Sequence, residues 1–416
     1  MGQTARRKST GRGAPERYFS FQYRTSVIYL RARTPRTGNG KDCRSPDQGG
    51  AYAHVRSVPE FSRNRRHKKM TLKRFFGGAA ALAMVFVLAA PLAVKTASAA
   101  TELLVYTAVE ADELSKFKNA FEEDNPDIEI KWVRDSTGIM GAKLLAEKDN
   151  PQADIVWGMA ATVLLQLLKE DYFQPYAPKG VDKLNPLYVD SKNDPPLWVG
   201  QRAYVASVCY NTVEAKKHKL PKPTSWKDLT KPVYRGHVIM PNPASSGTGF
   251  LDVSSWIQMW GEDDAWKFMD ALHENIARYT HSGSKPCKLA AAGEIPIGIS
   301  FAYRIVSSKE AGAPLEIVVP SEGIGWEVEA FAIVKNTDKL DAARKLADWT
   351  VSQKAMVLHA PGYAEVALPG VPNPVANFPK VGDKMIKNDF AWAGENKARI
   401  VAEWTKRYDS KSEPKG

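Results

Sequence analysis

Residues 102–138 read ELLVYTAVEADELSKFKNAFEEDNPDIEIKWVRDSTG, and this stretch decides the fold. The run 102–107 is short and apolar, which predicts a strand. Apolar residues recur at helical spacing over 111–124, and 128–133 alternates like a second strand. A strand, a helix and a strand in this order form a βαβ unit with parallel strands. We therefore expect an α/β protein whose ligands bind beyond the carboxyl ends of its strands.

The same alternation continues along the chain. It predicts further strands and helices at 139–149 (helix), 153–157 (strand), 162–170 (helix), 202–210 (strand), 238–240 (strand), 249–260 (helix), 263–272 (helix), 287–292 (helix), 297–300 (strand), 326–334 (strand) and 340–353 (helix). We expect two α/β lobes joined by crossing hinge strands. Residues 101–206 with 335–416 would form the first lobe, and 207–334, with the returning hinge strand, the second. A cleft between two such lobes closes on a ligand by hinge motion.

Residues 70–99, MTLKRFFGGAAALAMVFVLAAPLAVKTASA, have the pattern of an export signal. A basic start precedes an uncharged apolar run over 75–94, and an A-x-A site follows at 97–99. A membrane anchor is the alternative, because the apolar run is about long enough to span a bilayer. The abundance of Ala and Gly, the breaker Pro91 and the adjacent A-x-A site favour cleavage, which would place the mature protein in the periplasm.

Residues 1–69 are strongly basic, with 17 Lys and Arg against four acidic residues and no sustained apolar period. This segment is either a nucleic-acid-binding arm or a disordered or untranslated extension upstream of a true start at Met70. We favour the extension. Because the whole chain carries +12 and the export signal +3, residues 100–416 carry −4. A nucleic-acid function therefore loses its main support.

Four segments between an expected strand and an expected helix are rich in hydroxyl groups. They are Tyr-Thr-Ala at 106–108, Asp-Ser-Thr-Gly at 135–138, Asn-Pro-Ala-Ser-Ser-Gly-Thr-Gly at 242–249 and Ser-Gly-Ser-Lys-Pro at 282–286. Amides and hydroxyls at a helix start bind anions, although any one such loop is equally explained as an ordinary cap. Four of them in equivalent positions favour one convergent polar site for an oxyanion.

Charged and aromatic residues near these segments could hold a second ligand group. Glu110, Glu327 and Glu329 are candidate partners for an ammonium, and the alternative for each is a solvated charge or a hinge ion pair. Trp157, Trp326 and Tyr303 could offer aromatic faces to a cation, with core packing as the alternative for Trp326. A ligand with an anion at one end and an ammonium at the other would use both sets of groups.

Catalytic and metal-binding patterns are missing from the sequence. It contains no C-x-x-C, H-E-x-x-H or G-x-S-x-G, and its histidines are scattered singly. We therefore expect no enzyme, no cofactor and no metal site. Cys209 and Cys287 follow the export signal, and the sequence leaves open whether they form a disulfide or two separately buried thiols.

Residues 101–416 resemble the periplasmic solute-binding proteins of ABC importers. The resemblance rests on the opening segment at 103–138, on KLLAEKDNPQADIVWG at 143–158, on NPASSGTG at 242–249, on SGSKPCKLAAAGEIPIGISFAYR at 282–304, and on GIGWEVEAFAIVKN at 323–336 with DAARKLADWTVS at 341–352. Within the group that holds ferric-binding and phosphonate-binding members, the chain is most similar to 2-aminoethylphosphonate-binding proteins. The resemblance implies a monomer with the type II periplasmic binding fold, no catalysis, a small phosphonate ligand and delivery to a membrane permease.

The resemblance also implies a ligand site. The expected ligand-binding residues are Thr107, Glu110, Ser136, Thr137, Trp157, Ser245, Ser246, Gly247, Thr248, Ser282, Ser284, Tyr303, Glu327 and Glu329. Ferric-binding members carry a consecutive tyrosine pair where this chain has Ser300-Phe301-Ala302-Tyr303, with one tyrosine. Because Fe(III) favours several anionic oxygen ligands, the loss of one of the two phenolates argues against iron. A ferric or polyamine ligand is the alternative to the phosphonate.

Overall fold

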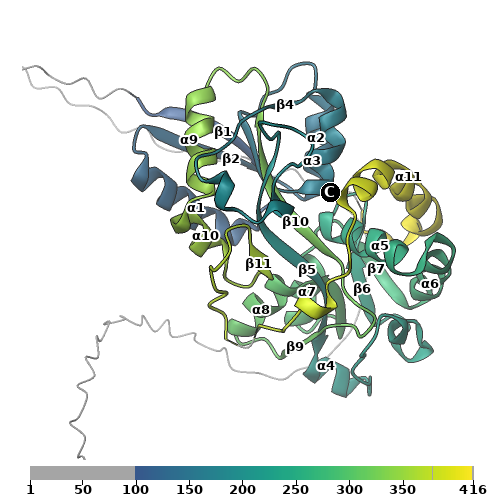
Figure 1. Cartoon of the computed structure of the whole chain (residues 1–416). Helices are drawn as coiled ribbons and strands as arrows, with labels where there is room; N and C mark the ends of the chain where they lie inside the picture. Colours follow the sequence, from purple (N-terminus) through teal and green to yellow (C-terminus); the bar gives the residue numbers. More distant parts are fainter. Residues whose placement is uncertain (1–98, 377, 415–416) are drawn as a thin grey trace, which may run out of the picture. The chain divides into compact units, whose positions relative to one another are not determined.

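A computed structural model describes residues 99–376 and 378–414 (Figure 1). It begins with the expected βαβ unit, formed by β1 (Thr101–Thr107), α1 (Ala111–Asp124) and β2 (Ile128–Arg134). The strands β1 and β2 pair in parallel along their whole length. Helix α1 buries Phe117 and Phe121 on one face, as its apolar spacing predicts.

One mixed sheet runs through the described part of the chain in the order β2-β1-β3-β10-β5-β8-β6-β7. The remaining strands are β3 (Ile155–Ala160), β4 (Phe173–Gln174), β5 (Val199–Asn211), β6 (Val238–Pro241), β7 (Ile276–Thr280), β8 (Ile297–Phe301), β9 (Leu315–Val318), β10 (Trp326–Val334) and β11 (Glu365–Val366). The pairs β1·β3, β6·β7 and β6·β8 are parallel, whereas β10 runs antiparallel to both β3 and β5.

The long strands β5 and β10 join the two halves of the sheet. Strand β5 is buried over all 13 residues, pairing with β10 at its start and with β8 and β9 at its end. One α/β lobe is built on β1, β2 and β3, the other on β6, β7 and β8, and Figure 1 shows β5 and β10 crossing between them. The structure thus confirms the expected fold of two α/β lobes with crossing hinge strands.

Helices cover the sheet in both lobes. They are α2 (Thr137–Ala146), α3 (Ala161–Leu167), α4 (Thr212–Lys217), α5 (Gly247–Trp260), α6 (Glu262–Asn275), α7 (Lys285–Ala291), α8 (Ala302–Glu310), α9 (Leu340–Thr350), α10 (Gln353–His359) and α11 (Phe390–Tyr408). Helix α9 matches the expected helix at 340–353 but ends at Thr350, and α10 begins at Gln353 as a separate helix that was not predicted. The long α11, which we did not predict, packs on α3 of one lobe and α5 of the other.

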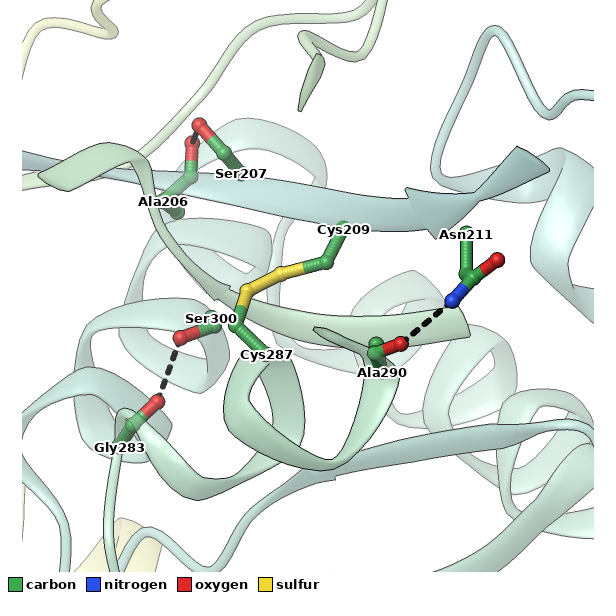
Figure 2. The surroundings of a disulfide bond; sticks show 8 residues. All are labelled: Ala206, Ser207, Cys209, Asn211, Gly283, Cys287, Ala290 and Ser300. Atoms are coloured by element: carbon green, nitrogen blue, oxygen red, sulfur yellow. Dashed lines mark hydrogen bonds between the residues drawn. A yellow bond between two sulfur atoms is a disulfide. The ribbon is translucent and has the colours of Figure 1, made fainter. Parts of the chain in front are cut away.

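The two cysteines of the described region form a disulfide. Cys209 lies on β5 and Cys287 on α7, with Cα atoms 5.7 Å apart, and Figure 2 shows the bridge from the hinge strand to the helix. Both are buried in a small cluster with Ala290, Ile305 and Leu315. The sequence left open whether Cys209 and Cys287 form a disulfide or two separate thiols, and the structure shows the disulfide. Because it closes a loop of 78 residues, the chain-entropy model assigns it about 4 kcal/mol of stability.

The predicted export signal and basic extension fall outside the described residues, apart from Ala99. Within residues 99–376 and 378–414, no helix combines the length and apolar character needed to cross a membrane.

Candidate functional site: a polar cleft between the lobes

A cleft of about 460 Å³, its open mouth included, lies between the lobes. Its walls come from the segments that follow β1, β2 and β3, from the hinge strands, from the start of α5 and from the segment before α7. The lining residues are Ala108, Glu110, Arg134, Ser136, Thr137, Gly158, Ala160, Tyr204, Ser246, Gly247, Thr248, Ser282, Gly283, Phe301 and Glu329.

Two helices from different lobes begin at this cleft. Ser136 is the N-cap residue of α2, and Ser246 is that of α5, where its hydroxyl accepts from the Gly249 amide at 3.2 Å. The Gly138 amide in the first turn of α2 donates to the Ser245 carbonyl at 2.9 Å, so the two helix starts touch across the cleft. Each helix start offers free amides and partial positive charge to an anion.

Glycines permit this close approach of the lobes. A Cβ atom at position 138 would lie 2.2 Å from the Ala244 carbonyl oxygen, and one at position 247 would lie 2.7 Å from the Thr137 hydroxyl oxygen. Both distances are far shorter than van der Waals contact, so any larger residue would push the lobes apart. Gly247 therefore shapes the cleft although it has no side chain of its own.

Four hydroxyl groups in the cleft are available to a ligand. Ser136, Thr137, Tyr204 and Thr248 line the cleft, and their side-chain oxygens have no hydrogen-bond partner within residues 99–376 and 378–414. All four residues are buried to nine-tenths or more. Because enclosed hydroxyls normally have partners, these four are suited to donate to an incoming oxyanion.

Arg134 supplies the positive charge of the cleft. It is the last residue of β2, and its Nε donates to the Val109 carbonyl at 3.0 Å. One terminal nitrogen lies 3.8 Å from a Glu110 oxygen, and the side chain stays partly exposed. The guanidinium is thus fixed by the backbone while part of it remains free to meet a ligand.

The Glu110 carboxylate is already held by cations from the other lobe. Arg304 of α8 donates to it at 2.6 Å, and Lys288 of α7 lies 3.4 Å away. Arg304 also makes two bonds of 2.9 Å to Asp112. Hydrogen bonding to Arg304 lowers the pKa of Asp112 below its usual value. These contacts link the start of α1 in one lobe to α8 in the other.

The Glu329 carboxylate lies on β10 at the hinge, where it accepts from Nε of Arg202 at 2.6 Å. The fully buried Arg202 also makes two bonds, of 2.8 and 3.0 Å, to Glu113. Burial raises the pKa of Glu329 to about 7, although the Arg202 charge acts in the opposite direction. Burial also acts to raise the pKa of Glu113, but there the charges and hydrogen bonds of Arg202 and Lys116 together outweigh it, and the pKa falls below its usual value.

Part of the predicted ligand set lines the cleft. The structure brings together Glu110, Ser136, Thr137, Ser246, Gly247, Thr248, Ser282 and Glu329. Arg134, Tyr204 and Phe301 line it as well, and sequence reasoning missed them. Arg134 directly precedes the Asp-Ser-Thr-Gly segment, which is a usable signal, whereas Tyr204 reaches the cleft through the pairing of β5 with β10.

Three predicted residues make other contacts in the structure. The Trp157 indole donates to the Thr350 hydroxyl at 2.8 Å, and its ring packs 5.0 Å from that of Phe117 in the core of the first lobe. Tyr303 stacks on Tyr363 with 4.9 Å between ring centroids. The carboxylate of Glu327 accepts from the Thr162 hydroxyl at 2.6 Å.

The other three lie just behind the cleft wall and support it. The Thr107 hydroxyl accepts from the Val109 amide at 3.1 Å. Ser245 donates to the His281 carbonyl at 3.1 Å, and the Ser284 hydroxyl lies 3.0 Å from that of Ser282. Trp326 also belongs to the hydrophobic core, and its indole donates to the Ile386 carbonyl at 2.9 Å.

The sequence profile of the family described as bacterial extracellular solute-binding protein matches residues 150–399. The chain belongs to this family of solute-binding proteins. An uncharacterized protein of Haemophilus influenzae is 34% identical over 280 residues, which is 65% of this chain and 79% of the relative. The probable ABC transporter periplasmic-binding protein y4fP of Sinorhizobium fredii is 26% identical over 263 residues, or 60% and 70% of the two chains.

A solved structure supports the same assignment. The periplasmic binding protein AfuA from Actinobacillus pleuropneumoniae, determined with exogenous fructose-6-phosphate bound, is 29% identical and aligns with a TM-score of 0.69. The alignment covers 74% of this chain and 99% of AfuA. The chain is therefore a bacterial extracellular solute-binding protein with the type II periplasmic binding fold.

Metal-binding side chains do not gather in the described part of this solute-binding protein. Across residues 99–376 and 378–414, no group of three or more His, Cys, Asp or Glu side chains is arranged to hold a metal ion.

Proposed function

We propose that this solute-binding protein captures a small organophosphorus anion in the periplasm, with 2-aminoethylphosphonate as the first candidate, and delivers it to a membrane permease. One observation carries the proposal. The starts of α2 and α5 meet in the cleft beside Arg134 and beside hydroxyls of Ser136, Thr137 and Thr248 that have no partner in the described part of the chain.

The chemistry of the cleft fits a tetrahedral oxyanion. A phosphonate or phosphate monoester offers three acceptor oxygens and up to two negative charges. Helix-start amides, hydroxyls and one guanidinium supply donors from several directions, and each hydrogen bond to a charged group contributes about 1.5–3 kcal/mol. Both lobes provide donors, so the anion would stabilise the closed form over an open one.

A hexose phosphate is the second candidate, and the likeness to AfuA favours it. AfuA is described with fructose-6-phosphate bound, and this chain aligns with nearly all of it. A sugar phosphate presents the same anionic group, but its organic part carries hydroxyls instead of an ammonium. The two candidates therefore share the anion site and differ at the other end of the cleft.

We also propose that the protein is exported through a cleaved signal and works as a monomer. We expect secretion through a signal at 70–99, so that mass spectrometry of the exported protein finds Ala100 or Thr101 first. A monomer on size-exclusion chromatography, with and without ligand, fits a carrier that moves between solute and permease. A protein that retains residues 1–99 would contradict the predicted cleavage.

The binding site is tested by removing one hydroxyl. Calorimetric titration of residues 100–416 with 2-aminoethylphosphonate and with fructose-6-phosphate is compared for the wild type and Thr248→Ala. Loss of one hydrogen bond to the charged ligand should lower the affinity roughly tenfold. Ser191→Ala, which removes an exposed hydroxyl, is the matched control. An affinity that Thr248→Ala leaves unchanged would remove the α5 start from the site.

A further inference from the structure

Three carboxylates near the cleft differ in how fully their oxygens are bonded. Glu113 accepts four hydrogen bonds, from Lys116, from two nitrogens of Arg202 and from the Tyr363 hydroxyl. Glu110 is held by Arg304 and Lys288. Both side chains are therefore engaged by the protein's own cations.

The Glu329 side chain is different. It receives one side-chain hydrogen bond from the described residues, at Oε2 from Arg202, and Oε1 receives none. Arg202 cannot offer Glu329 a second nitrogen, because its two terminal nitrogens are bound to Glu113 and its guanidinium lies 3.6 Å from the Tyr363 ring centroid. A carboxylate oxygen that lines the cleft is thus left open to a donor from outside the protein.

The sheet pairing places Glu329 on the floor of the cleft. It lies opposite Arg202 on β5, and Glu327 lies opposite Tyr204 two pairs further along. The Tyr204 hydroxyl approaches the start of α5, since a Cβ atom on Gly247 would lie 3.3 Å from it. The anion donors at the helix starts and the open carboxylate at the hinge therefore belong to one continuous cleft.

We infer that Glu329 is the subsite that receives a cationic end of the ligand, and that it makes the cleft select organophosphorus anions bearing an ammonium. The inference rests on the proposed function, because it concerns the second end of the same ligand. An ammonium at Glu329 would donate a hydrogen bond to the open Oε1. It would also add a second positive charge beside two carboxylates, Glu329 and Glu113, that otherwise share the single charge of Arg202. A neutral ligand end would leave a buried carboxylate without this compensation.

The ionisation of Glu329 agrees with this role. The charged groups around it are Arg202 on β5, Glu113 on α1 and Glu110 before α1, and burial among them raises the pKa of Glu329 to about 7. Near neutral pH the empty cleft therefore holds a mixture of protonated and ionised Glu329. Binding of an ammonium would favour the ionised form and release a proton to the buffer.

The experiment compares two ligands that differ in the amine alone. Residues 100–416 are titrated calorimetrically with 2-aminoethylphosphonate and ethylphosphonate, for the wild type, Glu329→Gln and the control Glu316→Gln, whose carboxylate is paired with Lys222 on the surface. We expect the wild type to prefer the amine roughly tenfold to a hundredfold, Glu329→Gln to lose this preference while still binding ethylphosphonate, and the control to keep it.

A second measurement counts protons. The wild type and Glu329→Gln are titrated with 2-aminoethylphosphonate at pH 7 in buffers of different ionisation enthalpy. The wild type should release more protons than Glu329→Gln, and the proton change of the ligand itself cancels because the ligand is the same.

Each contrary result has a distinct meaning. Equal wild-type affinity for the two ligands, or equal proton release by the wild type and Glu329→Gln, would overturn the cation subsite and leave phosphonate binding intact. Equal losses for both ligands in Glu329→Gln would make Glu329 a structural hinge residue and also overturn it. If neither these phosphonates nor a hexose phosphate binds, the proposed function fails and the subsite fails with it.

Discussion

Replacing Arg304 should weaken ligand binding while leaving both lobes folded. Arg304 is the residue that ties α8 of one lobe to the start of α1 in the other, through bonds to Glu110 and Asp112. Arg304→Gln removes the charge and the fork of donors but keeps much of the side chain's volume. The lobes would then be free to open, because this link contributes to the closed form alone.

The size of the effect follows from the exposure of the two carboxylates. Glu110 is buried, so its bond from Arg304 counts as a charged hydrogen bond of about 1.5–3 kcal/mol. Asp112 is half exposed, so its two bonds together add at most about 1 kcal/mol. Lys288 remains near Glu110 in the variant and offsets part of the loss. A net cost of about 2 kcal/mol corresponds to roughly thirtyfold weaker binding.

The assay combines calorimetric affinity with small-angle scattering of the apo and loaded protein. Arg235→Gln is the matched control, because Arg235 forms an exposed ion pair with Glu274 and both residues lie within 207–334, in one lobe. We expect Arg304→Gln alone to weaken binding and to enlarge the apo radius of gyration. Wild-type affinity together with wild-type dimensions would refute the idea that these ion pairs hold the lobes closed.

Three further predictions concern stability and the cleft wall. Changing Cys209 and Cys287 together to Ser should lower the free energy of unfolding in urea by about 4 kcal/mol, and an unchanged value would mean that the bridge adds nothing. The raised pKa of Glu329 means that this carboxyl holds more proton in the folded than in the unfolded protein between about pH 4.5 and 7, so its contribution to stability is lost as pH rises through this range. Glu329→Gln should remove this contribution, at most about 3 kcal/mol, and parallel pH profiles of the two proteins would contradict the prediction. Glu413 accepts from the His281 amide at 2.7 Å beside the Ser282 segment, so Glu413→Gln should speed amide hydrogen exchange there, whereas unchanged exchange would show that the wall is held by other contacts.

The fold could be predicted from the sequence because the apolar pattern of most elements agrees with the side on which each element is buried. The opening helix at 111–124 and the hinge strand at 326–334 match the structure residue for residue. The apolar residues of the helix lie on one face, which is buried, and the strand is buried along its whole length, so each sequence pattern agrees with the packing of its element. Helix α11 was missed because its buried face includes Gly394 and Lys397, which break the apolar pattern. The buried face of α11 is determined by the two lobes on which the helix packs, and a short stretch of sequence carries no information about these distant contacts.

The candidate site was predicted in part for the same reason. Hydroxyls at helix starts can be recognised from local sequence, and Ser136, Thr137 and Thr248 do line the cleft. Side chains on a strand are harder to place, because pairing determines where they point. Tyr204 reaches the cleft while Trp157 packs into the core, and both come from strands that are buried along their whole length.

The central claim is the capture of an organophosphorus anion, and a thermal-shift screen of purified residues 100–416 tests it most directly. The panel holds 2-aminoethylphosphonate, ethylphosphonate, fructose-6-phosphate, inorganic phosphate, spermidine and a ferric salt. A ligand at a hundredfold excess over its Kd adds about 2.7 kcal/mol of stability, which should raise the melting temperature by about 4 °C. We predict this rise with an organic phosphonate or phosphate and none with spermidine or ferric ion. A rise with spermidine or ferric ion alone would contradict the account, although the fold would stand.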